Sequence, residues 1–127
     1  MARSSRLRQR GIRQVRIAVK VSSRRFVMLD VGEVYYLEAE GHDVLVRTAR
    51  KTRLRSVRSL GDLEKTLKRR GFLRVHKSFV VNLDRVREVR IRKGDDNDWE
   101  LKLDPPVNAV LPVGRGYLPG LRRALEF

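Results

Sequence analysis

The sequence predicts a mainly β domain with little helix, of the α+β class, with one helix in the middle of the chain and one at its C-terminus. Three observations support this class. Apolar residues alternate with others over residues 15–21, short apolar runs recur at close intervals, and only two stretches carry a helical period. Small β domains bury their apolar faces by packing sheets together or by closing a barrel.

The N-terminal half is expected to form short strands joined by tight turns. The alternation over residues 15–21 is typical of a half-buried strand, in which successive side chains point to opposite faces. The connection Gly41-His42-Asp43 has the composition of a hairpin turn. The predicted strands cover residues 15–21, 25–29, 34–39, 44–46 and 51–55.

The mid-chain helix has the clearest signals in the sequence. Ser59 is a good N-cap, and Asp62 follows three residues later in the S-x-x-D capping pattern. Three cations at residues 68–70 stand where the negative end of the helix dipole would lie, and Gly71 can adopt the left-handed conformation that ends many helices. The predicted apolar stripe consists of Leu60, Leu63 and Leu67.

The C-terminal half is expected to add further strands and the last helix. Residues 72–82 are rich in apolar residues but follow no simple period. Residues 86–92 and 99–103 predict a hairpin, and residues 109–113 predict a final strand after the break at Pro105-Pro106. Pro119 suits the first turn of a short terminal helix. Its apolar face would carry Leu118, Leu121 and Leu125.

Composition and charge restrict the class of partner. The chain has 127 residues, with 30 Lys and Arg against 15 Asp and Glu, a net charge of +15 and no cysteine. One domain fits this length, and the lack of cysteine excludes disulfides and thiolate metal sites. A large positive excess favours a polyanion, with nucleic acid before an anionic membrane surface. Residues 1–14, whose charges are all positive, are expected to form a flexible basic arm, and residues 15–127 the folded domain.

No apolar stretch approaches the roughly 18 residues that a membrane-spanning helix needs, and no signal-peptide segment follows the basic N-terminus. We therefore expect a cytoplasmic protein without membrane contact.

Catalysis finds little support in the residues. His42 and His76 lack cysteine partners and helical metal-ligand spacing, and the run Asp95-Asp96-Asn97-Asp98 fits a solvated hairpin tip better than a calcium loop. His76 and Ser78 would share a strand face, but nothing nearby would orient the imidazole. The favoured alternative is that His76 hydrogen-bonds locally and Ser78 caps a helical turn. We expect no enzyme activity, no cofactor and no metal.

A dense run of cations favours nucleic acid. On a strand, Lys51, Arg53 and Arg55 would project from one face about 6.6–6.8 Å apart, comparable to the spacing of successive phosphates. Arginine can also hold a phosphate or a guanine edge with two hydrogen bonds. The alternative for this stretch is a merely solvated cationic face. The run, which contains no acidic residue, comprises Arg47, Arg50, Lys51, Arg53, Arg55 and Arg58.

Four segments, in order, resemble the LytTR DNA-binding domain family. Residues 72–82, F-L-R-V-H-K-S-F-V-V-N, resemble its signature F-x-R-x-H-R-S followed by apolar residues and Asn. Residues 34–39, 59–64 and 111–118 resemble its I-x-Y-I-E-A strand, its S-L-x-x-L-E helix and its closing I-P-V-S-R-x-Y segment. The resemblance covers about residues 15–126.

The resemblance implies an elongated β-β-β arrangement of about ten short strands in three small sheets. Domains of this family bind duplex DNA through loops that enter successive major grooves, and they bend the duplex. Most are output halves of two-component response regulators and commonly act as dimers on repeated half-sites. The implied partners are therefore promoter repeats in double-stranded DNA, a second copy of the chain, and a receiver domain or partner protein outside this chain.

The resemblance also implies three base-reading positions, each in a connection between elements. They are His42 beside Gly41, Lys77 in the H-[R/K]-S segment, and Arg115 after the P-V strand. The sequence departs from the family pattern at Lys77, where Arg is frequent, and at Gly114, where Ser is frequent. Lysine is a poorer bidentate reader than arginine, which favours a phosphate contact at Lys77.

The sequence therefore predicts a sequence-specific, double-stranded DNA-binding transcription regulator without catalysis. The predicted phosphate-binding residues are Arg47, Arg50, Lys51, Arg53, Arg55 and Ser78. One alternative is a basic RNA-binding or ribosome-associated protein, and another is an enzyme accessory domain that binds an acidic protein. RNA-binding modules usually display stacking aromatic residues on a sheet. Here the aromatic residues predicted to lie in the core are Phe26, Tyr35, Tyr36, Phe72, Phe79 and Trp99.

Overall fold

The computed structural model describes residues 15–92, 94 and 97–127. The predicted basic arm at residues 1–14, and Asp95 and Asp96 of the acidic run, lie outside the described residues. The strands are β1 (Arg16–Ser22), β2 (Arg25–Asp30), β3 (Val34–Glu40), β4 (Asp43–Thr48), β5 (Leu54–Ser56), β6 (Phe72–His76), β7 (Phe79–Asn82), β8 (Val86–Ile91), β9 (Trp99–Leu103) and β10 (Val110–Val113). The helices are α2 (Leu60–Leu67) and α3 (Leu118–Leu125), with short 3-10 turns η1 (Val31–Glu33), η2 (Lys68–Arg70), η3 (Leu83–Arg85) and η4 (Arg115–Tyr117).

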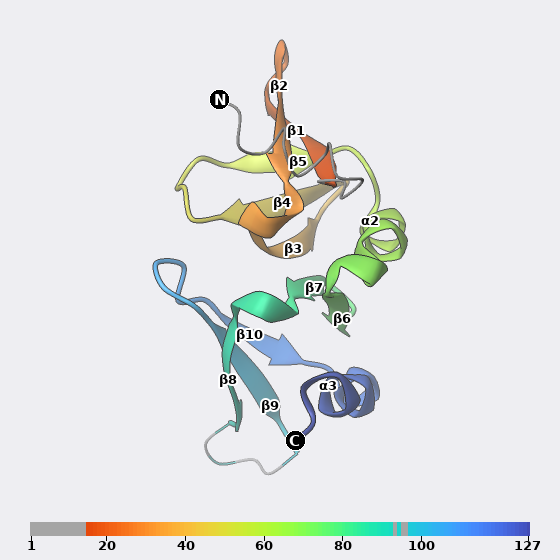
Figure 1. Cartoon of the computed structure of the whole chain (residues 1–127), viewed down its shortest axis with the longest axis vertical. Coiled ribbons are helices and arrows are strands. Elements are labelled where there is room, and N and C mark those ends of the chain that lie inside the picture. The colour runs from red at the N-terminus through yellow and green to blue at the C-terminus, as the bar shows by residue number, and fades with distance from the viewer. Residues whose placement is uncertain (1–14, 93, 95–96) are drawn as a thin grey trace, which may run out of the picture.

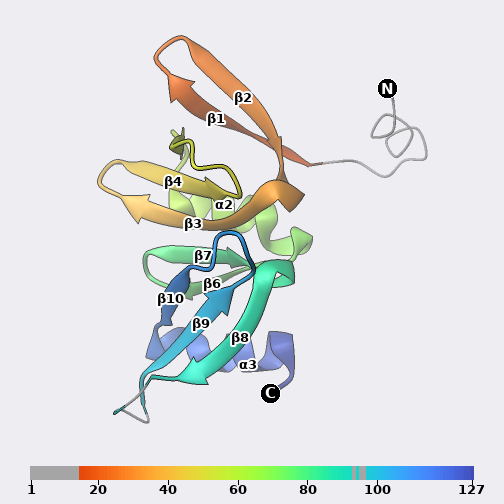
Figure 2. The same ribbon diagram turned by 90° about the vertical axis from the view of Figure 1, so that its left-hand side faces the viewer.

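The strands form two antiparallel sheets in an elongated molecule (Figures 1 and 2). The order in the larger sheet is β2-β1-β5-β4-β3-β7-β6, and the smaller sheet has the order β10-β9-β8. The mainly β fold with ten strands is confirmed, but the expected three sheets are wrong. The β6–β7 hairpin joins the larger sheet because β3 pairs with β7, with Tyr36 opposite Val81 and Glu38 opposite Phe79.

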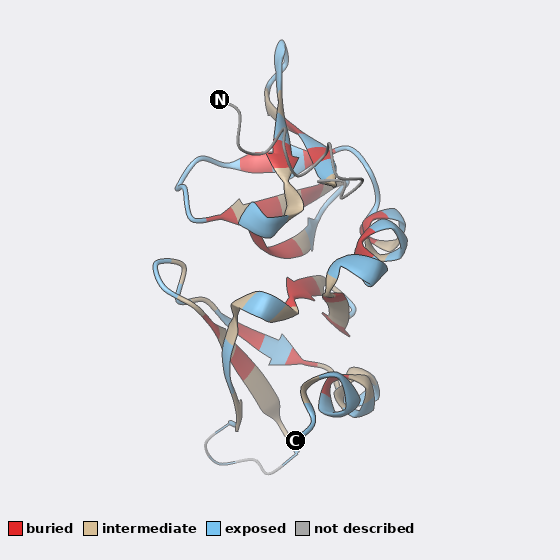
Figure 3. Cartoon of the chain, viewed as in Figure 1, coloured by how far each residue is buried: buried red, intermediate tan, exposed pale blue. Residues whose placement is uncertain are grey.

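Two apolar cores lie on either side of β3 and β7 (Figure 3). One core combines residues of β1, β2, β4, β5 and α2, and the other combines residues of β6, the smaller sheet and α3. Strand β3 contributes Leu37 to the first core and Tyr36 to the second, while β7 contributes Val80 and Val81 in the same way. Neighbouring residues of a strand point to opposite faces, so both strands are buried on both sides.

Helix α2 forms as its sequence signals predict. The backbone N–H of Asp62 donates a hydrogen bond to Ser59 Oγ at 3.1 Å, and the three stripe leucines are buried. The 3-10 turn η2 continues the helix, and Gly71 ends it with φ of +85°. The helix thereby covers the first core, and the chain continues from η2 through Gly71 into β6.

Three local expectations are wrong. Only residues 54 and 55 of the predicted strand 51–55 belong to β5 (Leu54–Ser56). Leu54 and Ser56 are buried beside β4, whereas residues 51–53 have no apolar side chain to bury. Ser78 lies in the turn between β6 and β7 and not in a helical turn. Phe26 is 53% exposed on the edge strand β2, although the tyrosines and Phe72 are buried as predicted. No helix among the described residues is long and apolar enough to cross a membrane.

Candidate nucleic-acid interface

His42 lies at the tip of the β3–β4 hairpin. Glu40 pairs with Asp43, so Gly41 and His42 form a two-residue turn. Gly41 has φ of +61°, the positive value that the first turn residue of a type II′ hairpin requires. His42 is exposed there. The turn therefore displays the imidazole beyond the end of the sheet.

Lys77 lies at the tip of the β6–β7 hairpin, where Arg74 supports the turn from within. Arg74 Nη1 is 2.9 Å from Glu64 Oε1 of α2, its Nε donates to the carbonyl oxygen of His76 at 3.1 Å, and its Nη2 donates to the carbonyl oxygen of Lys77. The backbone N–H of Ser78 donates to His76 Nδ1 at 3.1 Å, so the predicted local hydrogen bond of His76 is confirmed. Lys77 itself is exposed on this braced turn.

Arg115 follows β10 as the first residue of the 3-10 turn η4 and is exposed. Gly114 precedes it at a point of close approach. A Cβ atom at Gly114 would lie 3.0 Å from Cδ2 of Tyr117, tighter than most real Cβ contacts. A side chain at position 114, such as the serine of the family pattern, would therefore require the ring of Tyr117 to shift slightly.

Backbone hydrogen bonds join these three segments side by side. The N–H of Ala39, at the end of β3, donates to the carbonyl oxygen of Ser78 at 2.9 Å. The N–H of Gly114 donates to the carbonyl oxygen of Val75 at 2.8 Å. The β3–β4 turn, the β6–β7 turn and the end of β10 consequently lie along one edge of the molecule, on the left of Figure 2. We call this edge the turn edge.

Two of the predicted phosphate-binding arginines point toward carboxylates near the turn edge. Arg53 forms an ion pair with Glu40, and Arg55 Nη1 lies 3.3 Å from Asp43 Oδ2. Both acidic residues flank the turn that carries His42. All four side chains are well exposed, so these pairs are weak and screened by salt. Sequence reasoning missed both pairs, because the partners are 12 and 13 residues apart in the chain.

The other predicted phosphate contacts are spread over the domain. Arg50 and Lys51 follow β4 at the end opposite His42, and Arg50 lines a hollow there with Glu33 and Arg85. Arg47 is half-buried, and its Nε donates to the carbonyl oxygen of Thr48. Ser78 belongs to the Lys77 turn. The structure thus brings part of the predicted set to the turn edge and leaves Arg50 and Lys51 away from it.

Two groups on β3 have shifted pKa values. Burial raises the pKa of Glu38 above its usual value of 4.5, Glu40 raises it further, and Arg53 lowers it. Burial likewise raises the pKa of Tyr36, with a further rise from Glu38 and an opposing effect of Arg47. Glu38 pairs with Leu45 on one side and Phe79 on the other, so it lies on β3 where the His42 hairpin meets the Lys77 hairpin.

Sequence reasoning also missed the role of Arg74 and Glu64. Arg74 is part of the F-L-R-V-H-K-S run. Its position two residues before His76 is the feature of the sequence that could have indicated a contact with the turn. Within the described part of the chain, no group of three or more His, Cys, Asp or Glu side chains is placed to hold a metal ion. The exposed groups of the turn edge are an imidazole, an amine and guanidinium groups, two of which pair with the carboxylates of Glu40 and Asp43. Imidazole, amine and guanidinium groups suit the recognition of nucleic acid by hydrogen bonds and charge.

Comparisons with known proteins agree with this architecture. The CO-responsive transcriptional regulator RcoM of Rhodospirillum rubrum is 36% identical over 97 residues, which are 76% of this chain and 39% of that protein. The sensory transduction protein LytT of Bacillus anthracis is 28% identical over 100 residues, 79% of this chain and again 39% of that protein. The chain thus spans about two-fifths of the length of these relatives.

A solved LytTr DNA-binding domain, from a putative methyl-accepting/DNA response regulator of Bacillus cereus, has the same fold. It superposes with a TM-score of 0.74 at 22% identity, covering 88% of this chain and 97% of that one. The LytTr DNA-binding domain family itself matches residues 24–126, which include all three turns of the turn edge. The chain therefore belongs to the LytTR family of DNA-binding domains.

Proposed function

We propose that this domain binds duplex DNA with its turn edge and reads base edges with His42, Lys77 and Arg115. The observation that carries the proposal is the pair of backbone hydrogen bonds, from Ala39 N–H to Ser78 and from Gly114 N–H to Val75, that align the three turns. Binding residues are usually displayed on loops held by a rigid scaffold. Because the turns lie in a row on an elongated molecule, they suit successive positions along a duplex.

The charges of the molecule support binding to a polyanion. The net charge is +15, and Arg53 and Arg55 beside the turn edge can exchange their exposed carboxylate partners for phosphates. Arg47, Arg50, Lys51 and Ser78 remain predicted phosphate contacts. If about six phosphates are neutralised, the logarithm of the binding constant should fall with the logarithm of salt concentration with a slope near −5.

The wider role follows from the kind of proteins that the chain resembles. One curated relative is named a transcriptional regulator and the other a sensory transduction protein. We therefore infer that the domain regulates transcription, that two copies bind repeated half-sites, and that a sensory or receiver part outside residues 1–127 controls it. Catalysis by this domain is not part of the proposal.

Selection of bound sequences from random duplexes tests the proposal. A recurring motif is expected, and paired copies of it at fixed spacing would report binding as a dimer. Structured RNA should compete less well than the selected duplex. Recovery of no motif, or stronger competition by RNA than by duplex DNA, would contradict sequence-specific DNA recognition.

Arg115→Ala tests the assignment of base reading, with Arg123→Ala on α3 as a control that removes the same charge from another exposed position. Loss of one good base contact should weaken binding to the selected duplex about 5- to 150-fold, and binding to random duplex much less. Arg123→Ala should affect both duplexes equally and weakly. Equal losses on both duplexes for Arg115→Ala would exclude its role as a base reader.

A further inference from the structure

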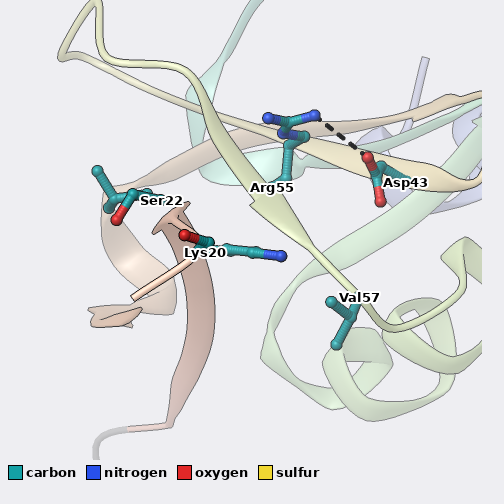
Figure 4. Close-up of a pocket in the computed structure, with 7 residues that line it drawn as sticks. Lys20, Ser22, Asp43, Arg55 and Val57 are labelled. Carbon is teal, nitrogen blue, oxygen red and sulfur yellow. Dashed lines mark hydrogen bonds and ion pairs between the residues drawn. The ribbon is translucent and has the colours of Figure 1, made fainter. Parts of the chain in front are cut away.

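A hollow of about 270 Å³ opens beside the β1–β2 turn, next to the turn edge. Strands β1, β4 and β5 and the β1–β2 turn contribute its polar lining, which comprises Lys20, Ser22, Ser23, Asp43 and Arg55 (Figure 4). In Figure 2 the β1–β2 turn lies on the same side of the molecule as the β3–β4 and β6–β7 turns. The residues that line the hollow therefore lie on the side of the molecule that carries the turn edge.

Two cations meet at this hollow without a matching number of acids. Lys20 on β1 is paired directly with Arg55 on β5. Like charges at opposite positions of neighbouring strands destabilise a sheet. Asp43 forms an ion pair with Arg55, whereas the side chain of Lys20 has no hydrogen-bond or ion-pair partner among the described residues. Figure 4 shows the side chain of Lys20 extending from β1 toward Val57, below the Arg55–Asp43 pair.

The composition of the site is that of an anion site. One unpaired ammonium, a second cation and the hydroxyl groups of Ser22 and Ser23 can donate hydrogen bonds to a bound anion. The contrast within β1 is informative, because Arg16 at the other end of the same strand is already paired with Asp30 at 3.1 Å. An anion at the hollow would relieve the repulsion between Lys20 and Arg55.

The position of the hollow indicates that its anion would be a phosphate of the DNA backbone. Strand β5 separates β1 from β4, so β1 lies about 10 Å from β4, the strand that leads out of the His42 turn. The major groove of DNA is about 12 Å wide. A side chain on β1 thus falls near the sugar-phosphate backbone that borders the groove that His42 would enter. Lys20, Ser22 and Ser23 also precede residue 24, where the family match begins.

We propose that Lys20, with the hydroxyl groups of Ser22 and Ser23, binds a backbone phosphate of the DNA at this hollow. This proposal rests on the proposed function and adds a contact outside the three base-reading turns. The contact is independent of sequence, since it is made to phosphate alone. It would extend the interface by the β1–β2 hairpin.

The test compares Lys20→Gln with Arg16→Gln, which removes the same charge from the opposite end of the same strand. Lys20→Gln is expected to lower affinity about 3- to 10-fold, equally for selected and random duplexes, and to make the salt slope shallower by about 0.9. Arg16→Gln should leave the salt slope unchanged. Equal effects of the two variants on affinity and slope would overturn the proposal, as would a loss confined to the selected duplex.

The double variant Ser22→Ala with Ser23→Ala tests the hydroxyl groups without changing charge. It should weaken binding to both duplexes while keeping the salt slope of the wild type. If Lys20→Gln fails to fold, this double variant still tests the proposed contact. Unchanged affinity in this variant would exclude the hydroxyl groups from the contact. Lys20→Gln should melt no lower than the wild type, because it removes the repulsion with Arg55.

Inorganic phosphate distinguishes a DNA phosphate from a free anion. Backbone NMR resonances of residues 20–25 should shift on adding duplex DNA to the wild type and should shift less in Lys20→Gln. If inorganic phosphate shifts these resonances while Lys20→Gln binds duplex as the wild type does, the hollow is a free-anion site and the proposal fails. If the wild type binds no duplex at all, the proposed function itself fails, which is a separate outcome.

Discussion

The two hairpin turns that carry His42 and Lys77 lie side by side but are stabilised in different ways. The Lys77 turn is braced from inside by Arg74, which contacts the carbonyl oxygens of His76 and Lys77 and the carboxylate of Glu64. The His42 turn depends on the positive φ of Gly41 and on two exposed ion pairs that flank it. One turn is therefore fixed by partly buried hydrogen bonds and the other by backbone conformation.

This difference indicates a division of roles at the interface. A turn held by a partly buried guanidinium keeps its geometry at any salt concentration, because buried pairs are screened little. Exposed ion pairs weaken with salt and can be exchanged for contacts to phosphate. We therefore expect the Lys77 turn to behave as a rigid reference and the His42 turn to adjust when DNA binds.

Arg74→Ala should have the largest effect, because it removes the brace of the rigid turn. The side chain of Arg74 is only 21% exposed and serves three acceptors, so the loss should be about 2 kcal/mol, or a fall in Tm of roughly 10 °C. DNA affinity should also fall more than tenfold, since Lys77 loses its fixed position. Thermal unfolding and duplex titration measure both quantities.

Arg87→Ala is the control for this change, because Arg87 forms an ion pair with Asp104 but is 59% exposed. Pairs of that kind contribute about 0–1 kcal/mol. If Arg74→Ala and Arg87→Ala lowered Tm by the same amount, the β6–β7 turn would not be braced as described.

Gly41→Ala should have the next largest effect, through backbone conformation alone. A Cβ atom at Gly41 would meet nothing within 4 Å, but the residue has φ of +61°. The left-handed conformation costs alanine about 1 kcal/mol relative to glycine. Gly32→Ala is the matched control, because its added Cβ also meets nothing and its φ is not positive. Equal unfolding free energies for the two variants would show that the His42 turn does not depend on glycine.

Elements that depend on residues close together in the sequence were predictable. The supports of the two turns were not predictable, because they join residues that are far apart in the sequence. Helix α2 follows from Ser59, its leucine stripe and Gly71, all of which act within a few residues. The supports of the turns act over longer distances: Arg74 reaches Glu64 of α2, and Arg53 reaches Glu40. Charge density suggested an unopposed cationic strand at residues 51–55, but the exposed acids that pair with it lie on neighbouring strands.

The number of sheets depended on a contact of the same long-range kind. Pairing of β3 with β7 joins hairpins that are more than thirty residues apart in sequence, as Glu38 and Phe79 show. No local pattern encodes this pairing. The choice of His42, Lys77 and Arg115 came from the family resemblance, and the backbone hydrogen bonds of Ala39 and Gly114 place their turns along one edge.

Glu40→Gln should sharpen the comparison through charge, with a smaller effect. Removal of this carboxylate frees Arg53 and removes an acid beside the His42 turn, so duplex affinity should rise about two- to threefold at low salt and return to the wild-type value at high salt. Asp84→Asn is the control, because η3 follows the end of β7 farthest from the Lys77 turn. A similar gain for both variants would mean that only the net charge matters.

Glu38→Gln should give the smallest effect, at the point where the two hairpins join. Burial raises the pKa of Glu38 above 4.5 in the folded protein, so the folded state favours its protonated form. The stability that this protonation contributes is fully present below pH 4.5 and is lost as pH rises through the folded pKa. At neutral pH Glu38→Gln should therefore melt slightly higher than the wild type, and the two should converge in acid. A gain in Tm that persisted unchanged below pH 4.5 would mean that glutamine stabilises the junction by packing and not by removing a charge.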